Sequence, residues 1–495
     1  MKKQGFIKGA AIMAAASLVC KILSAVFKIP LDRFFLHEDG IAVFQSASSV
    51  YNVFLAICVT GIPIALSSLV ARADDEETAT LCKSTLYTVT AFCAVFAVII
   101  FVFANEIATL LSGGGHAPAA YALRVSALAL PFLGMISAGR GFFQGKSNML
   151  PSALSQISES FIKAVLGTVV CAFLIKKGIE SGAAGAMAGV CLGAISAAII
   201  LFTYYRKHIP RGGKFSKKAA ISVIKLSLPV TLGAFGYTAV VLIDSLSVTS
   251  LLALSGADAA ERLKLFGYLS RANTVYNLPA TIITAVTLSA VPSVAAAIKN
   301  KGGLSESVQK SVKMILLVSF PCAFGLMLFS KPILSLLYAS ANHYELLSLT
   351  GLLVIIMPYV QATTAMLQAA LKVWKPIVAT FVSIVVKVIL NFLLIPEIGV
   401  DGAPIATAVS FLIALGINTF LFRKELLQRK FIFTIVKVML CALAACAFAR
   451  GIYLFKETPI ILMVSIGVAV AVYFILIYAS RSVSKEELLQ LKGGV

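Results

Sequence analysis

Apolar residues run through this chain in long unbroken blocks, and short polar segments separate the blocks. A helix that crosses the hydrocarbon of a membrane needs about 20 apolar residues, because the layer is about 30 Å thick and each residue adds about 1.5 Å. The blocks reach that length, and they do not alternate as barrel strands do. The pattern therefore predicts about fourteen transmembrane helices, near residues 7–31, 42–71, 84–111, 119–143, 150–175, 183–205, 219–252, 270–298, 311–337, 345–371, 376–396, 402–422, 431–453 and 459–480.

Composition agrees with a chain that folds inside a bilayer. Hydrophobic residues are 59% of the 495 residues and charged residues only 13%, whereas soluble domains carry about 25% charged residues. The formal net charge is +21. On a soluble domain this charge would indicate nucleic acid, but here the basic residues follow the loops, so we expect no nucleic-acid partner. The predicted class is an all-α polytopic membrane protein.

Lysines and arginines gather in alternate loops, and this orients the chain. One set of loops carries most of them, at 2–8, 72–83, 146, 206–218, 299–310, 372–375, 423–430 and 481–492. By the positive-inside rule, both termini lie in the cytoplasm of a cell-membrane protein with an even number of spans. The basic start and apolar run up to Cys20 resemble a signal peptide, but no small-residue cleavage site precedes Cys20. A retained first transmembrane helix is favoured.

Two halves of the chain repeat short motifs in the same order. The run Glu180-Ser-Gly-Ala-Ala-Gly-Ala186 has its counterpart in Glu397-Ile-Gly-Val-Asp-Gly-Ala403. Each half holds six spans, so the repeat is parallel, and a cavity between two such bundles suits alternating access. The predicted organisation is a six-helix bundle over 1–206, a basic linker over 207–218, a second six-helix bundle over 219–425, two additional transmembrane helices over 426–481 and a cytoplasmic tail over 482–495.

Charged side chains inside the apolar blocks carry most of the functional information, because a charge in hydrocarbon costs a few kcal/mol unless it faces water or a partner. In the first span, Lys21, Ser24 and Lys28 lie on one helix face, and the two lysines are about 10 Å apart along the axis. Two ammonium groups at that spacing suit an anionic ligand. The alternative is that the side chains extend to the headgroups, which fits Lys28 better than Lys21.

Span five carries the polar stripe Ser155, Glu159 and Lys163, whose members are one helical turn apart. Glu159 and Lys163 are suited to pair with each other, so a structural ion pair and a role in substrate binding both stay open. Span eight carries Arg271 a few residues inside its outer edge. Its guanidinium is suited to grip a phosphate through two nitrogen atoms, or else to extend to the headgroups.

Span eleven repeats the stripe as Ser383, Lys387 and Asn391, and this recurrence favours a cavity wall in each half. Span seven holds one acid, Asp244, which suits a cation, a proton or a salt bridge to a nearby lysine. The sequence has no motif for metal catalysis, nucleotide binding or a nucleophilic serine, and its nine cysteines lack zinc spacing. We therefore expect no enzyme activity, no resident metal and no cofactor.

Several runs resemble a known family. The run from Arg140 to Pro151, Arg-Gly-Phe-Phe-Gln-Gly-Lys-Ser-Asn-Met-Leu-Pro, and the run Gly61-Ile-Pro-Ile-Ala-Leu-Ser67 resemble the stage V sporulation protein B family. That family is part of the multidrug/oligosaccharidyl-lipid/polysaccharide exporter superfamily, whose signature for spans eleven and twelve is similar to the segment 387–403. The resemblance covers nearly the whole chain.

The resemblance implies a flippase that moves a polyprenyl-pyrophosphate-linked saccharide, such as a lipid II-like or polysaccharide precursor, between leaflets. Lys21, Lys28 and Arg271 look similar to cavity cations of the related lipid II flippases, although their span-two arginine has no counterpart between 52 and 56. Asp244, Asn391 and Thr407 are similar to the coupling-ion site of those flippases, which implies coupling to Na+ or H+.

The implied partners are the lipid-linked saccharide, membrane lipids and the enzymes that synthesise or polymerise the saccharide. Two other functions stay open. A cation-coupled multidrug exporter of the same superfamily needs an acidic, aromatic pocket, and the intramembrane bases here outnumber the acids. A membrane enzyme acting on lipid-linked sugars needs large outer loops, and those predicted here are short.

Overall fold

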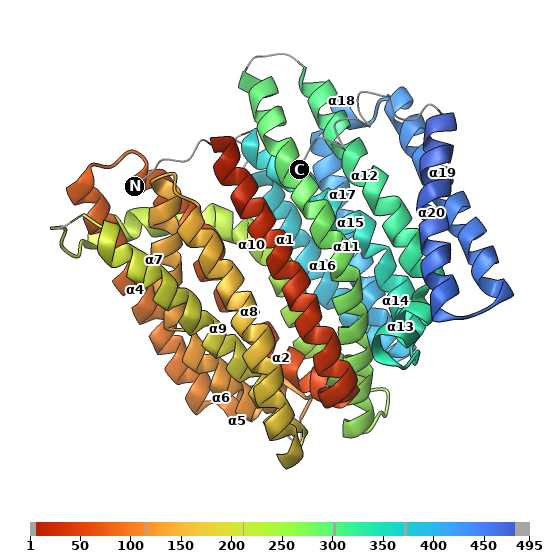
Figure 1. Ribbon diagram of the computed structural model, residues 1–495, viewed down its shortest axis with the longest axis horizontal. Helices are drawn as coiled ribbons and strands as arrows, with labels where there is room; N and C mark the ends of the chain where they lie inside the picture. Colours follow the sequence, from red (N-terminus) through yellow and green to blue (C-terminus); the bar gives the residue numbers. More distant parts are fainter. Residues whose placement is uncertain (1–5, 115–116, 211, 300–302, 371–373, 481–495) are drawn as a thin grey trace. The chain divides into compact units, whose positions relative to one another are not determined.

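The computed structural model describes all residues except 1–5, 115–116, 211, 300–302, 371–373 and 481–495, and the described chain is α-helical with no strand (Figure 1). The predicted all-α class is confirmed, whereas the predicted tail over 482–495 lies outside the described residues. The helices are α1 Phe6–Leu31, α2 His37–Ala56, α3 Ile62–Val70, α4 Asp75–Val102, α5 Ala104–Leu111, α6 Ala120–Ala129, α7 Phe132–Gly145, α8 Leu150–Leu174, α9 Ile179–His208, α10 Lys217–Leu252, α11 Ala259–Lys299, α12 Leu304–Leu328, α13 Ser330–Tyr338, α14 Tyr344–Gly351, α15 Leu353–Ala369, α16 Trp374–Ile398, α17 Gly402–Leu421, α18 Arg423–Leu426, α19 Arg429–Phe455 and α20 Pro459–Ala479.

Long apolar helices make the chain an integral membrane protein. In the described residues, 9 helical stretches are long and apolar enough to cross a membrane, or up to 11 if each bent pair is one span. Two of them, Ala11–Val70 with 60 residues and Trp374–Leu421 with 48, each have the length of two crossings. Large side chains such as Phe455, 92% exposed, and Ile460, 77% exposed, face outward as lipid contacts do. The predicted count of fourteen is compatible with these lengths and stays a prediction.

A proline accounts for one of the two irregular turns in the first long stretch. A proline ring collides with the carbonyl four residues earlier and removes a helical hydrogen bond. The π-helical turn η2, Ile57–Gly61, directly precedes α3, which has Pro63 in its first turn, so the carbonyl that Pro63 displaces lies inside η2. The other π-helical turn of this stretch is η1, Asp32–Leu36. The wider π turn is a common way to accommodate such a defect.

By packing, the described chain divides into two compact units. Unit 1 takes the described residues of 1–270 and 391–400, and unit 2 takes those of 271–390 and 401–495. Helix α10, which was predicted to open the second bundle, packs against α2, α3, α4 and α5 of unit 1. The sequence repeat and the packing units therefore have different boundaries, and the predicted bundles stay a prediction about the repeat.

Unit 1 is built around the pair α8 and α9, with α1 packed on α8 and α6 on α9. A seam of glycines on α9, formed by Gly185, Gly189 and Gly193, lets the two backbones approach closely. A Cβ added to Gly193 would lie 2.6 Å from the carbonyl oxygen of Glu159. Small residues at such spacing are typical of helix contacts in membranes.

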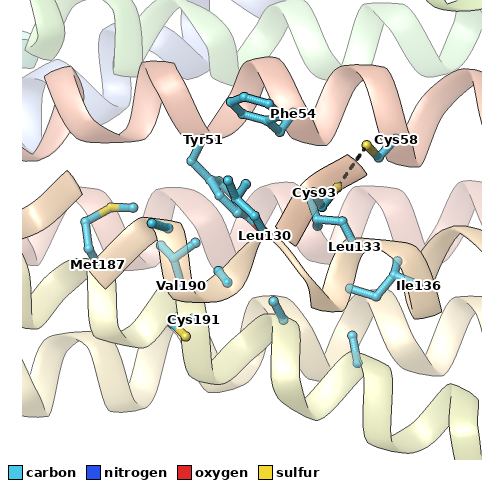
Figure 2. Close-up of a cluster of buried hydrophobic side chains, with 14 of the residues drawn as sticks. Tyr51, Phe54, Cys58, Cys93, Leu130, Leu133, Ile136, Met187, Val190 and Cys191 are labelled. Atoms are coloured by element: carbon cyan, nitrogen blue, oxygen red, sulfur yellow. Dashed lines mark hydrogen bonds between the residues drawn. The ribbon is translucent and has the colours of Figure 1, made fainter. Parts of the chain in front are cut away.

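A buried hydrophobic cluster connects α2, α4, α7 and α9 of this unit (Figure 2). Tyr51 and Phe54 contribute from α2 and Met187 from α9. The Sγ atoms of Cys58 and Cys93 lie 3.4 Å apart in it. This packing fixes the helices that carry the polar residues described next.

In unit 2, α12 packs against α14, α15 and α19, α15 packs against α17, and α19 pairs with α20. A small buried cluster of Phe329, Ala449, Tyr453 and Leu462 joins the start of α13 to the α19–α20 hairpin.

Candidate functional site

Three lysines come together in unit 1, and we call Lys21, Lys28 and Lys163 the lysine cluster. The Lys163 Nζ on α8 donates a hydrogen bond to Ser24 Oγ on α1 at 3.3 Å, and Lys28 Nζ donates to Gln45 Oε1 on α2 at 2.9 Å. Lys28 lies within electrostatic range of Lys163 and Lys21, and Lys163 within range of Lys21. The structure thus brings the predicted face of Lys21, Ser24 and Lys28 next to Lys163, which the sequence placed in a separate stripe on α8.

The lysines of α1 occupy a different flank of the helix from Ile22 and Val26, its two most exposed large apolar residues. Phe27, 2% exposed, faces α8, where a Cβ added to Gly167 would lie 2.9 Å from its ring. Ile22 and Val26, which are 54% and 57% exposed, lie about 100–160° around the axis from Lys21 and Lys28. Lys28 is partly buried and Lys21 is exposed. Lys21, Ser24 and Lys28 therefore share one flank, as the spacing predicts, and Ile22 and Val26 face away from it.

Glu159, also on α8, does not pair with the lysine one turn away. Its Oε2 accepts a 2.8 Å bond from Arg140 Nη2 on α7, while Arg140 Nε donates to Ser155 Oγ at 3.1 Å. Of the ion pairs described in the structure, none joins Glu159 to Lys163. Sequence reasoning used Arg140 only as part of the family run. The sequence does show that Arg140 is a base inside an apolar block, and such a base needs a nearby acid, which would have pointed to Glu159.

A second polar group lies where α10 meets the end of α16. Asn391 Nδ2 donates to Asp244 Oδ1 at 3.1 Å and to Ser247 Oγ at 2.8 Å. The Oδ1 of Asn391 is buried and accepts no hydrogen bond from the described residues. The structure thus brings together two of the three predicted coupling-ion residues, and Ser247 joins them.

Unit 2 holds the remaining predicted residues in two places. Lys387, with 0% exposure, donates to the carbonyl oxygen of Ala403 at 2.8 Å and to Thr407 Oγ1 at 2.6 Å, so it ties α16 to α17. Arg271 is 4% exposed, and its Cζ lies 5.2 Å from the centre of the Tyr338 ring. Lys387 thus makes a structural contact, and its expected place in a cavity wall and its contact with substrate stay predictions.

The lysine cluster has the chemistry of an anion site. Three ammonium groups supply up to nine donors, and the nearby carboxylate Glu159 is matched by Arg140. Asp32, 1% exposed, lies within electrostatic range of Lys28 and has its own contacts. The balance is positive, which suits a ligand with two or more negative charges.

Two families match the chain. The polysaccharide biosynthesis protein family matches residues 6–299, and MatE matches residues 267–393. Three relatives from Bacillus subtilis (strain 168) are similar along most of their length. Stage V sporulation protein B is 25% identical over 99% of this chain and 98% of its own. The uncharacterized membrane protein YabM is 27% identical over 86% and 81%, and the lipid II flippase MurJ is 24% identical over 83% and 81%.

Solved structures share the fold. An inward closed conformation of lipid II flippase MurJ has a TM-score of 0.75 at 16% identity, covering 94% of this chain and 98% of that one. An inward-facing multidrug resistance MATE family transporter has a TM-score of 0.66 at 16% identity, covering 84% and 97%.

Proposed function

The chain belongs to the polysaccharide biosynthesis protein family, and on that premise we propose that it is a membrane flippase. It moves a polyprenyl-pyrophosphate-linked saccharide, of the lipid II or polysaccharide-precursor type, from the inner to the outer leaflet by alternating access. The relatives named stage V sporulation protein B and lipid II flippase support this class of function, and so does the fold.

The observation that carries the proposal is the lysine cluster. A pyrophosphate and its sugars cannot enter hydrocarbon unaided, because each desolvated charge costs many kcal/mol. Lys21, Lys28 and Lys163 lie on helices of membrane-spanning length, and their ammonium groups offset that cost in the headgroup. The polyprenyl tail stays in the lipid. Arg271, an always-charged base in unit 2, is a separate candidate contact for phosphate.

We further propose that a coupling ion binds at Asp244, Asn391 and Ser247. These residues offer a carboxylate, an amide carbonyl and a hydroxyl, which are the oxygen ligands that hard cations prefer. The buried Asn391 Oδ1 supports the assignment, because a buried acceptor without a donor is unfavourable unless a cation or water satisfies it. Na+ fits this set, and a proton on Asp244 is the alternative. Thr407 bonds to Lys387 in this conformation.

The protein resides in the cell membrane with both termini in the cytoplasm, since its basic loops follow the positive-inside rule. Its partners are the lipid-linked saccharide, membrane lipids and the enzymes that synthesise or polymerise the saccharide. The MatE match gives some support to a multidrug exporter. However, an organic cation would be repelled by three ammonium groups, so the flippase is favoured.

The test is translocation in reconstituted vesicles of a fluorescent polyprenyl-pyrophosphate saccharide, measured by protection from an external quencher. The wild-type protein moves the probe, whereas Lys21→Ala, Lys28→Ala and Lys163→Ala each slow it at least tenfold. Lys177→Ala, which removes an exposed charge just after α8, is the matched control. Wild-type vesicles with no activity, or lysine variants as fast as the control, would overturn the proposal.

A further inference from the structure

Arg140 on α7 has no part in the function proposed so far, although it is charged and only 5% exposed. We infer that Arg140 is a positioning residue that holds Glu159 away from Lys163 and so keeps Lys163 available for the phosphate of the substrate. The effect on substrate binding rests on the proposed function, whereas the contacts of Arg140, Glu159 and Lys163 all lie within unit 1.

The sequence of α8 favours a pairing that the structure does not adopt. Glu159 lies four residues before Lys163, which is the favourable order for a helical ion pair. The two groups are within electrostatic range. Even so, the carboxylate accepts from Arg140 at 2.8 Å, and the Lys163 ammonium instead donates to Ser24 on α1 at 3.3 Å.

Arg140 binds Glu159 in preference to Lys163 because the Arg140 guanidinium is held by two partners. The planar guanidinium stays charged and offers several donors in a rigid arrangement. One donor binds Glu159 and another binds Ser155, whose own hydroxyl donates to the carbonyl of Ser152 at 2.7 Å. Lysine is flexible, and turning Glu159 toward it would leave the buried Arg140 without its counter-charge.

The pairing of Arg140 with Glu159 determines the net charge that the lysine cluster presents to an anionic ligand. With Arg140 in place, Glu159 is neutralised within its own pair, and all three lysines of the cluster keep their charge for an anion. Without Arg140, Glu159 turns to Lys163 and cancels one of the three. The net charge of the cluster then falls from three to two, and one charge-assisted contact to phosphate is lost.

Two measurements test the inference: the reactivity of the Lys163 amine and, separately, the translocation of the saccharide. Acylation of Lys163 by an amine-reactive ester, followed by mass spectrometry, reports how free the amine is. In Arg140→Gln, Glu159 pairs with Lys163, so acylation slows about fivefold or more. In Arg140→Gln/Glu159→Gln the rate returns to within about twofold of wild type. Arg140→Lys, which keeps the charge, shows whether a fold defect contributes.

Translocation of the fluorescent lipid-linked saccharide gives the second reading. Arg140→Gln raises the apparent KM for the saccharide about tenfold, and Arg140→Gln/Glu159→Gln restores the wild-type KM. In a Lys163→Ala background, Arg140→Gln changes the apparent KM by less than about twofold, because the lysine that it acts through is absent. Unchanged Lys163 acylation in a folded Arg140→Gln protein would overturn the inference. So would a double variant that is not restored. Expected acylation changes in a protein that moves no saccharide would leave the Arg140 inference standing and refute the proposed function.

Discussion

The contact between α8 and α9 places the strongest steric demand on the candidate site. Gly189 on α9 faces the backbone of α8 at Gly167. A Cβ added there would overlap Gly167 Cα and lie 2.5 Å from its nitrogen and 2.8 Å from the carbonyl oxygen of Lys163. These are backbone atoms, so no rotamer change relieves them. Because ordinary contacts begin near 3.4 Å, α8 must move by about 1 Å in Gly189→Ala.

The cost follows from that displacement. Overpacking of a close contact costs about 1–3 kcal/mol, and the upper half of that range applies where two backbones meet. Replacing glycine by alanine inside a helix returns about 0.5–1 kcal/mol, so the net loss of stability is about 1–2.5 kcal/mol. Since the displaced turn carries Lys163, the affinity for the lipid-linked saccharide falls as well.

The assay compares Gly189→Ala with Gly451→Ala by thermal unfolding in detergent and by saccharide binding. Gly451 lies in α19, and an added Cβ there meets nothing within 4 Å, so this control keeps or gains stability. Gly189→Ala melts several degrees lower than the control and binds more weakly. Equal melting temperatures for the two variants would refute the packing argument.

Three other predictions follow from single contacts. Asp244→Asn removes the carboxylate beside Asn391 and abolishes the dependence of transport on a Na+ or proton gradient; an unchanged ion dependence in vesicles would contradict the coupling site. Gly267→Leu lowers the melting temperature, because an added side chain meets the backbone of Glu38, whereas Gly325→Leu, in open space, does not. Arg271→Lys loses the planar guanidinium that is proposed to contact phosphate and weakens saccharide binding about tenfold; equal binding by both proteins would refute a role for Arg271 in binding.

Much of the architecture follows from local pattern. Unbroken apolar blocks predict membrane helices because the bilayer leaves backbone groups no other partners. Helical spacing also predicts that Lys21, Ser24 and Lys28 share a flank. The grouping of Asp244 with Asn391 came from the family resemblance, and the structure brings the pair together.

Other features depend on which helices meet, which spacing alone does not determine. Glu159 has one suitable base on its own helix and another, Arg140, far away in sequence, and only packing of α7 on α8 decides between them. Similarly, the close approach of α17 lets Thr407 bond to Lys387. Helix α10 packs on α2 and α3 in unit 1, although the sequence repeat assigns it to the second half.

In the proposed function, the lysine cluster holds the anionic headgroup of the substrate. The most direct measurement is equilibrium binding of a polyprenyl-pyrophosphate saccharide to the protein in nanodiscs, for wild type and for Lys21→Gln/Lys28→Gln/Lys163→Gln. Loss of three charge-assisted contacts, at about 1.5 kcal/mol or more each, predicts at least a hundredfold weaker binding and a reduced salt dependence. The same dissociation constant and the same salt dependence in both proteins would contradict the account.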